Sequence, residues 1–112
     1  MTTNLDRWQE RIDGIKRELL ALGEMRPGAL SKQFNVCGKP GCRCKDKRAP
    51  KKHGPYYQIS YTHLGKSTSE FVKRDQVPEA RKQLANYARF RRLTQEWVVL
   101  SLRIARARRK AG

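Results

Sequence analysis

Apolar residues recur at alternating spacings of three and four along the N-terminal part of the chain. The series is Leu5, Trp8, Ile12, Ile15, Leu19 and Leu22. This spacing places the side chains on one face of a helix, so it predicts an amphipathic helix over residues 3–23 with a heptad-like seam. Thr3 is the expected N-cap, with Asp6 completing a capping box. Gly23 is the expected C-cap.

The middle of the chain changes to a period of two, which is typical of strands. Tyr57, Ile59 and Tyr61 alternate with polar neighbours, and residues 68–72 alternate in the same way. Gly65 lies between the two runs and suits the left-handed position of a short hairpin loop. The pattern predicts an antiparallel β-hairpin within residues 30–76, extended to a three-stranded sheet by residues 30–36.

From Pro78 onward the helical period returns. The apolar series is Leu84, Tyr87, Phe90, Leu93, Trp97, Leu100 and Ile104. No glycine or proline interrupts it before Gly112, so we expect one helix over residues 78–110. A helix of about 30 residues is about 45 Å long. If the two helices pack antiparallel, about a third of the longer helix has no intramolecular cover. That end is then available for a homodimer.

The predicted fold class is therefore α+β. An N-terminal helix and a long C-terminal helix pack as an antiparallel helical hairpin, with a small antiparallel sheet and a cysteine-rich loop between them. A chain of 112 residues favours a single domain over residues 1–112.

Charge narrows the choice of partner. The chain has 26 Lys and Arg against 10 Asp and Glu, a formal net charge of +16. Such an excess attracts polyanions, so nucleic acid is the first expected partner and an anionic membrane surface the second. Nothing resembles a signal peptide or a spanning segment, and the longest apolar run is only Trp97 to Leu100. We expect no membrane association and a cytoplasmic location.

The three cysteines fall in one short stretch and are followed by a histidine. Their spacing is Cys-x4-Cys-x-Cys-x8-His, formed by Cys37, Cys42, Cys44 and His53. Three thiolates and one imidazole fill the tetrahedral ligand set of a structural zinc. His63 is an alternative fourth ligand. Thiols without a metal and an iron–sulfur cluster are the other interpretations.

Catalysis has little support in the sequence. GKST at residues 65–68 resembles the end of a phosphate-binding loop, but the glycine required five residues earlier is replaced by Ser60. The acids are few, and no residue pattern orients a cysteine against a histidine base. We therefore expect no enzymatic activity.

The expected nucleic-acid contacts come from three segments. Basic side chains dominate the cysteine loop, opposed only by Asp46, and others line the hairpin and the long helix. A hairpin can stack on bases or enter a major groove. The expected contacts are Lys39, Arg43, Lys45, Lys47, Arg48, Lys51, Lys52, Tyr56, Gln58, Lys66, Arg89, Arg92, Arg103, Arg106 and Arg109.

Several segments together resemble a known family. MRPGALSKQFNVCGKPGCRCK, HGPYYQISY, GKSTSEFV and NYARFRRLTQEW resemble small uncharacterised bacterial proteins often encoded near transposases. The resemblance covers most of residues 25–100. It implies a mobile-element setting, makes the three cysteines and His53 a unit, and carries no catalytic residue.

The leading hypothesis is a non-catalytic DNA-binding module that acts as an accessory or regulatory factor of a mobile element. One alternative is an interaction adaptor whose helical seam recruits a transposase or another partner. Another is a protein that binds structured RNA.

Overall fold

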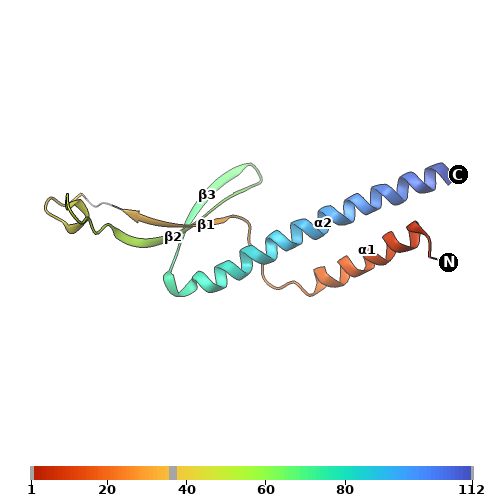
Figure 1. The fold of residues 1–112 in the computed structure, drawn as a ribbon, viewed down its shortest axis with the longest axis horizontal. Helices are drawn as coiled ribbons and strands as arrows, with labels where there is room; N and C mark the ends of the chain where they lie inside the picture. The colour runs from red at the N-terminus through yellow and green to blue at the C-terminus, as the bar shows by residue number, and fades with distance from the viewer. Residues whose placement is uncertain (1, 36–37, 112) are drawn as a thin grey trace. The chain divides into compact units, whose positions relative to one another are not determined.

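The computed structural model describes residues 2–35 and 38–111. It confirms the α+β class: in sequence order, a first helix is followed by a three-stranded antiparallel sheet and then by a long second helix (Figure 1). The chain forms two compact units: a helical unit of residues 1–25 and 85–112, and a sheet unit of residues 26–84. The elements are α1 (Asn4–Leu20), β1 (Ala29–Asn35), η1 (Arg43–Lys45), β2 (His53–His63), β3 (Lys66–Val72), η2 (Arg74–Gln76) and α2 (Val77–Ala111).

Helix α1 begins as its sequence predicts. The Thr3 side chain accepts a hydrogen bond from the Asp6 N–H, and the Asp6 carboxylate accepts one from the Thr3 N–H, both at 3.1 Å. The predicted C-cap at Gly23 is wrong. The helix ends at Leu20 and its C-cap is Ala21, whose backbone is right-handed. The Ala21 N–H donates to the carbonyls of Arg17 and Glu18, so the last turn closes without a left-handed glycine.

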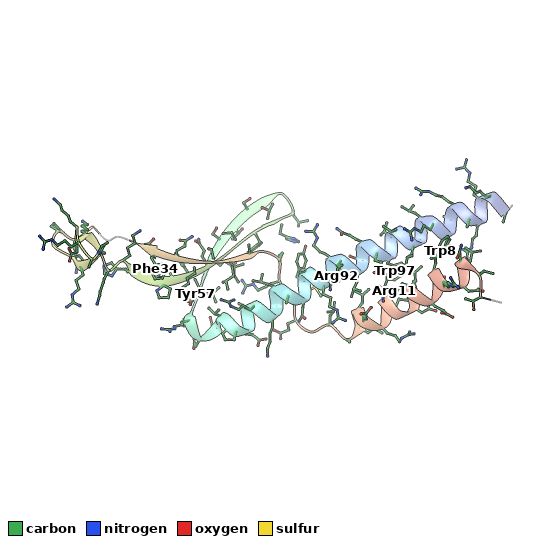
Figure 2. All side chains as sticks on the ribbon, viewed as in Figure 1. Trp8, Arg11, Phe34, Tyr57, Arg92 and Trp97 are labelled. Carbon is green, nitrogen blue, oxygen red and sulfur yellow. The ribbon has the colours of Figure 1, made fainter. Side chains whose placement is uncertain are left out.

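The helical unit is held by an apolar seam between α1 and the second part of α2. Ile12 and Ile15 are buried against three residues of α2, and Trp8 and Trp97 pack beside them (Figure 2). The buried partners on α2 are Leu93, Leu100 and Ile104. The sequence predicted that about a third of the long helix has no intramolecular cover. Along this seam the prediction is wrong, because α1 covers Leu100 and Ile104 of α2.

The first turns of α2, residues 77–84, belong to the sheet unit. Ile59 and Val72 on the sheet are buried together with Val77 and Ala80 from the first turns of α2. Tyr57 and Tyr61 are partly buried and pack against the same cluster. The first turns of α2 thus bury their apolar side chains on the sheet rather than on α1. Within the described ranges, no helix is long and apolar enough to span a bilayer.

The hairpin register follows the predicted turn. β2 and β3 pair antiparallel from Tyr57 opposite Val72 to His63 opposite Lys66. Leu64 and Gly65 form the two-residue connection and have φ angles of 51° and 79°. Two positive φ angles are the signature of a type I′ turn, whose twist matches that of the strands. On the other side, β1 pairs with β2 and has an irregularity between Gln33 and Asn35.

Candidate metal centre and basic loop

The segment between β1 and β2, residues 38–52, is here called the basic loop. Its backbone is folded by local hydrogen bonds around η1. The Cys42 N–H donates to the Lys39 carbonyl at 3.4 Å, and the Lys45 N–H donates to the Cys42 carbonyl at 3.0 Å. The Lys51 N–H then donates to the Arg43 carbonyl at 2.9 Å, which ties the returning chain to η1. The loop therefore presents Cys42 and Cys44 from one short turn.

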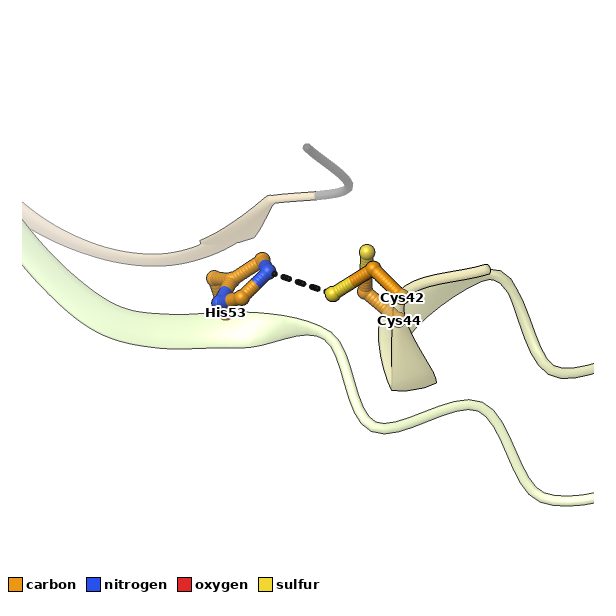
Figure 3. A group of neighbouring side chains, drawn as sticks. All are labelled: Cys42, Cys44 and His53. Carbon is orange, nitrogen blue, oxygen red and sulfur yellow. Dashed lines mark hydrogen bonds between the residues drawn. The ribbon is translucent and has the colours of Figure 1, made fainter. Parts of the chain in front are cut away.

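Three potential metal ligands meet at this turn (Figure 3). Cys42 Sγ lies 3.1 Å from His53 Nε2, and the ligand atoms of Cys42, Cys44 and His53 all lie within 4.8 Å of one another. In a tetrahedral zinc site with Zn–S bonds of ~2.3 Å, two sulfur ligands are about 3.8 Å apart. The three side chains are therefore close enough to bind a metal with little adjustment.

Burial separates these thiols from the rest of the loop. Cys44 is 2% exposed and Cys42 is partly buried, whereas the other described residues from Gly38 to Lys52 are exposed. The loop thus has thiols, rather than apolar side chains, as its interior. Small segments without an apolar core are commonly ordered by a bound metal. This burial pattern fits a structural metal ligand set.

The two histidines have different positions. His53 is the first residue of β2 and belongs to the cluster, whereas His63 is its last residue. Ten residues of extended strand separate them by about 33 Å. His63 is therefore not part of this cluster. The predicted ligand Cys37 lies outside the described residues.

The basic side chains of the loop form an uncompensated positive surface. All seven are exposed, and the ion pairs found among the described residues use other arginines. Asp46 is the loop's one acid, and its Oδ1 accepts a hydrogen bond from the Arg48 N–H at 3.0 Å. The seven residues are Lys39, Arg43, Lys45, Lys47, Arg48, Lys51 and Lys52.

The predicted contacts on the hairpin do not share one surface. Tyr56 is 42% exposed, and Gln58 follows it by two residues on the face of the sheet away from α2. Lys66 pairs with His63, which belongs to the opposite face together with Tyr61. Tyr56 and Gln58 are therefore grouped, and Lys66 is separate from them.

The predicted arginines of the long helix belong to the helical unit. Arg89 is engaged, because its Nη2 donates to Glu18 Oε1 at 3.0 Å. Glu18 of α1 therefore compensates part of the positive charge of α2. Arg92, Arg103, Arg106 and Arg109 are exposed.

Sequence reasoning missed two residues on the open face of the sheet. Phe71 lies opposite Gln58 and is 77% exposed, and Gln33 lies opposite Tyr56. The alternation around Phe71 was visible in the sequence. Only the strand register reveals which residues of β1 and β3 share a face with Tyr56 and Gln58.

Fold and site together define a small α+β protein with a candidate Cys/His metal centre in a basic loop. The chain belongs to the family described as Domain of unknown function (DUF6788), whose model matches residues 5–82. The match includes α1 apart from its first residue, the whole sheet and the cluster, and it ends within the first turns of α2. No curated protein and no solved structure matched the chain.

Proposed function

We propose that this protein is a non-catalytic nucleic-acid-binding module whose basic loop binds the phosphate backbone of DNA. One observation carries the proposal: the basic loop carries seven exposed basic side chains, none of which takes part in the ion pairs found among the described residues, next to the cluster of Cys42, Cys44 and His53. Seven like charges within 15 residues repel one another, so the folded loop gains most from a polyanion. Lysines and arginines that meet phosphates also release counterions, which favours binding.

Zinc is the proposed cofactor, held by Cys42, Cys44 and His53, with Cys37 as the fourth ligand. Bound there, it supplies a structural cross-link between η1 and the start of β2. The positive side chains next to the cluster offset the negative charge of a three-thiolate site. The metal's role is to order the loop that carries the phosphate contacts.

A binding function is favoured over a catalytic one, because the side chains that could act as nucleophile and base are the same ones that would hold the metal. The Cys42–His53 pair is the nearest approach to a nucleophile with a base, at 3.1 Å. A metal held by both side chains would block that chemistry. The family resemblance adds a setting: we propose an accessory or regulatory role in a mobile element, with DNA ahead of structured RNA.

A second candidate function is an interaction adaptor that recruits a transposase or another partner. It is favoured by apolar side chains left exposed on α2, where Val98, Val99 and Leu102 are 58%, 46% and 50% exposed. Light scattering of the purified chain and of the variant Val98→Lys/Leu102→Lys separates the two functions. A homodimer that the variant loses favours the dimeric DNA-binding module, whereas a monomer that aggregates through these residues favours the adaptor.

The main test is a fluorescence-anisotropy titration with duplex DNA, single-stranded DNA and hairpin RNA across salt concentrations. Lys47, Arg48, Lys51 and Lys52 are changed together to Gln. If each meets a phosphate, the slope of log K against log salt falls by about three to four on duplex DNA.

The matched control removes four exposed basic residues elsewhere by changing Arg7, Arg17, Arg81 and Lys82 to Gln. It changes the net charge equally, so its slope should fall much less. An equal loss in both variants would show only nonspecific attraction to the charge of the chain. Weak binding of the unmodified protein to all three ligands would reject the proposed function.

A further inference from the structure

The two faces of the sheet carry different charge. Directly paired residues of neighbouring strands project to the same face, so the register assigns each strand residue to one face. The face that packs on α2 carries Lys32, Lys66 and Glu70 among its side chains. The other face, here called the neutral face, has no charged side chain among the paired strand residues that the structure describes. It consists of Ala29, Ser31, Gln33, Tyr56, Gln58, Ser60, Thr62, Ser67, Ser69 and Phe71.

The neutral face is open and has two different halves. Near the hairpin turn, small hydroxyl side chains bond to one another: Ser60 to Ser69 at 3.0 Å and Thr62 to Ser67 at 2.9 Å. The half nearer the basic loop carries larger groups. There, Gln33 pairs with Tyr56 and Gln58 pairs with Phe71, so each amide stands opposite an aromatic ring.

Phe71 is the least expected member of this face. A phenylalanine that is 77% exposed on an edge strand buries little of its ring, so its burial contributes little to folding. Its position opposite the Gln58 amide gives the neutral face an apolar contact next to a hydrogen-bonding group, but no charge.

We infer that the neutral face reads base edges in the major groove of B-form duplex DNA, while the basic loop binds the adjoining backbone. The inference rests on the proposed function and specifies its ligand. A DNA groove has anionic phosphates along its rims and a neutral floor of donors, acceptors and thymine methyl groups. The β1–β2 hairpin has the complementary distribution, with a positive loop at its end and an uncharged polar face along its length.

The side-chain chemistry matches that floor. A glutamine amide can pair with the N6 and N7 atoms of adenine in the major groove, and an apolar side chain can contact the thymine methyl. The small hydroxyl residues leave room for close approach of the backbone. A-form RNA has a major groove too deep and narrow for side chains to read, so duplex DNA is the better fit.

The test uses the full chain and separates preference for one DNA sequence from overall affinity for DNA. A preferred duplex is first selected from a random library at physiological salt. Affinities for that duplex and a scrambled one are then measured for the unmodified protein, Gln58→Ala and Phe71→Ala. Each variant should lose roughly tenfold of the preference, the size of one lost base contact, with the salt slope unchanged.

The matched control is Leu64→Ala at the hairpin turn, a residue that is 92% exposed and outside the neutral face. It should keep the full preference. Melting curves of the variants establish that each is folded. Dimethyl sulfate, which modifies the N7 atom of guanine in the major groove, should show protection within the selected site that Gln58→Ala weakens.

The other outcomes overturn the inference in distinguishable ways. Steep salt-dependent binding with no preferred duplex, or preference unchanged in both variants, would leave a backbone-binding loop alone. Tighter binding to single-stranded DNA that Phe71→Ala weakens would make the face a stacking platform instead. If the unmodified protein binds no nucleic acid at all, the proposed function itself fails.

Discussion

Arg11 of α1 donates hydrogen bonds to both carboxylate oxygens of Glu96 of α2, from Nε to Oε2 and from Nη2 to Oε1. Arg11 Nη1 also donates to Glu18 at 3.1 Å, and Glu18 accepts from Arg89. These links join the two helices on one side of the apolar seam. Because Glu18 pairs with Arg89 while Arg11 pairs with Glu96, they also define the antiparallel register.

The Arg11–Glu96 pair predicts a dependence of stability on pH. The hydrogen bond from Arg11 lowers the pKa of Glu96, burial opposes this, and the positive charges of Arg11 and Arg92 lower it further. A group whose pKa is depressed by folding stabilises the fold above its unfolded pKa, about 4.3 for glutamate. That stability is lost as the pH falls through the folded value.

We therefore expect the melting temperature of the helical unit to drop as the pH falls below about 4, and to drop less in Glu96→Gln. Trp8 and Trp97 are the chain's two tryptophans and both pack in the seam, so their fluorescence reports this unit. Glu10→Gln, an exposed acid outside the ion pairs, is the control. Identical pH profiles for all three proteins would show that the pair contributes no stability.

Ile15 anchors the same seam and is fully buried. Ile15→Ala should lower the free energy of unfolding of the helical unit by about 2–5 kcal/mol, through lost apolar burial and the cavity left behind. Denaturant unfolding followed by tryptophan fluorescence measures the change. Leu20→Ala is the control, since Leu20 is 88% exposed, and it should change stability by less than about 0.5 kcal/mol. A similar loss of unfolding free energy in both variants would show that Ile15 is not buried in a seam between the helices.

The helices could be predicted because their signals are local. The seam residues Ile12 and Ile15 stand out by spacing, and the Thr3–Asp6 box needs only four consecutive residues. The cover of Leu100 was misjudged because it depends on tertiary packing. Periodicity shows that a face is apolar, but it does not show whether a helix or a sheet covers it.

The candidate site was predictable to a similar extent. The spacing of Cys42, Cys44 and His53 indicated a ligand set, and the structure places the three side chains together. The structure also places His63 far from this cluster, whereas the spacing in the sequence left it as an alternative fourth ligand. The neutral face was not predictable, because pairing Gln58 with Phe71 requires the strand register.

The hairpin turn offers a stability test within the sheet unit. Leu64 has a φ of 51°, a left-handed conformation that costs a residue with a Cβ atom roughly 1–2 kcal/mol. Leu64→Gly removes this cost, and Leu64 is too exposed to lose packing, so we expect stabilisation by about 1 kcal/mol. Hydrogen exchange of the paired amides of β2 and β3 measures it.

Gly65→Ala is the matched opposite of that substitution. Gly65 has a φ of 79°, and a Cβ atom there would meet no heavy atom within 4 Å. Any loss therefore reflects backbone conformation alone, and we expect destabilisation by about 1 kcal/mol. Faster exchange in Leu64→Gly, or no change in Gly65→Ala, would argue against a type I′ turn.

The metal centre predicts a difference between the two histidines. Protein purified without added zinc should contain about one zinc per chain. His53→Ala should weaken zinc binding by at least the roughly 10- to 100-fold that loss of a supporting residue costs. His63→Ala should leave it unchanged, because His63 lies at the far end of β2. Competition with a chelator of known affinity measures both variants.

A second matched pair separates a lost ligand from a disturbed turn. Cys44 and Lys45 are neighbours in η1, but Cys44 is buried in the cluster and Lys45 is exposed. Cys44→Ser should lose zinc and lower the melting temperature of the sheet unit, whereas Lys45→Ser should keep both. Cys44→Ser should also flatten the salt dependence of DNA binding, because the loop no longer holds its lysines and arginines together. Equal zinc content in Cys44→Ser and the unmodified protein would rule out Cys44 as a ligand.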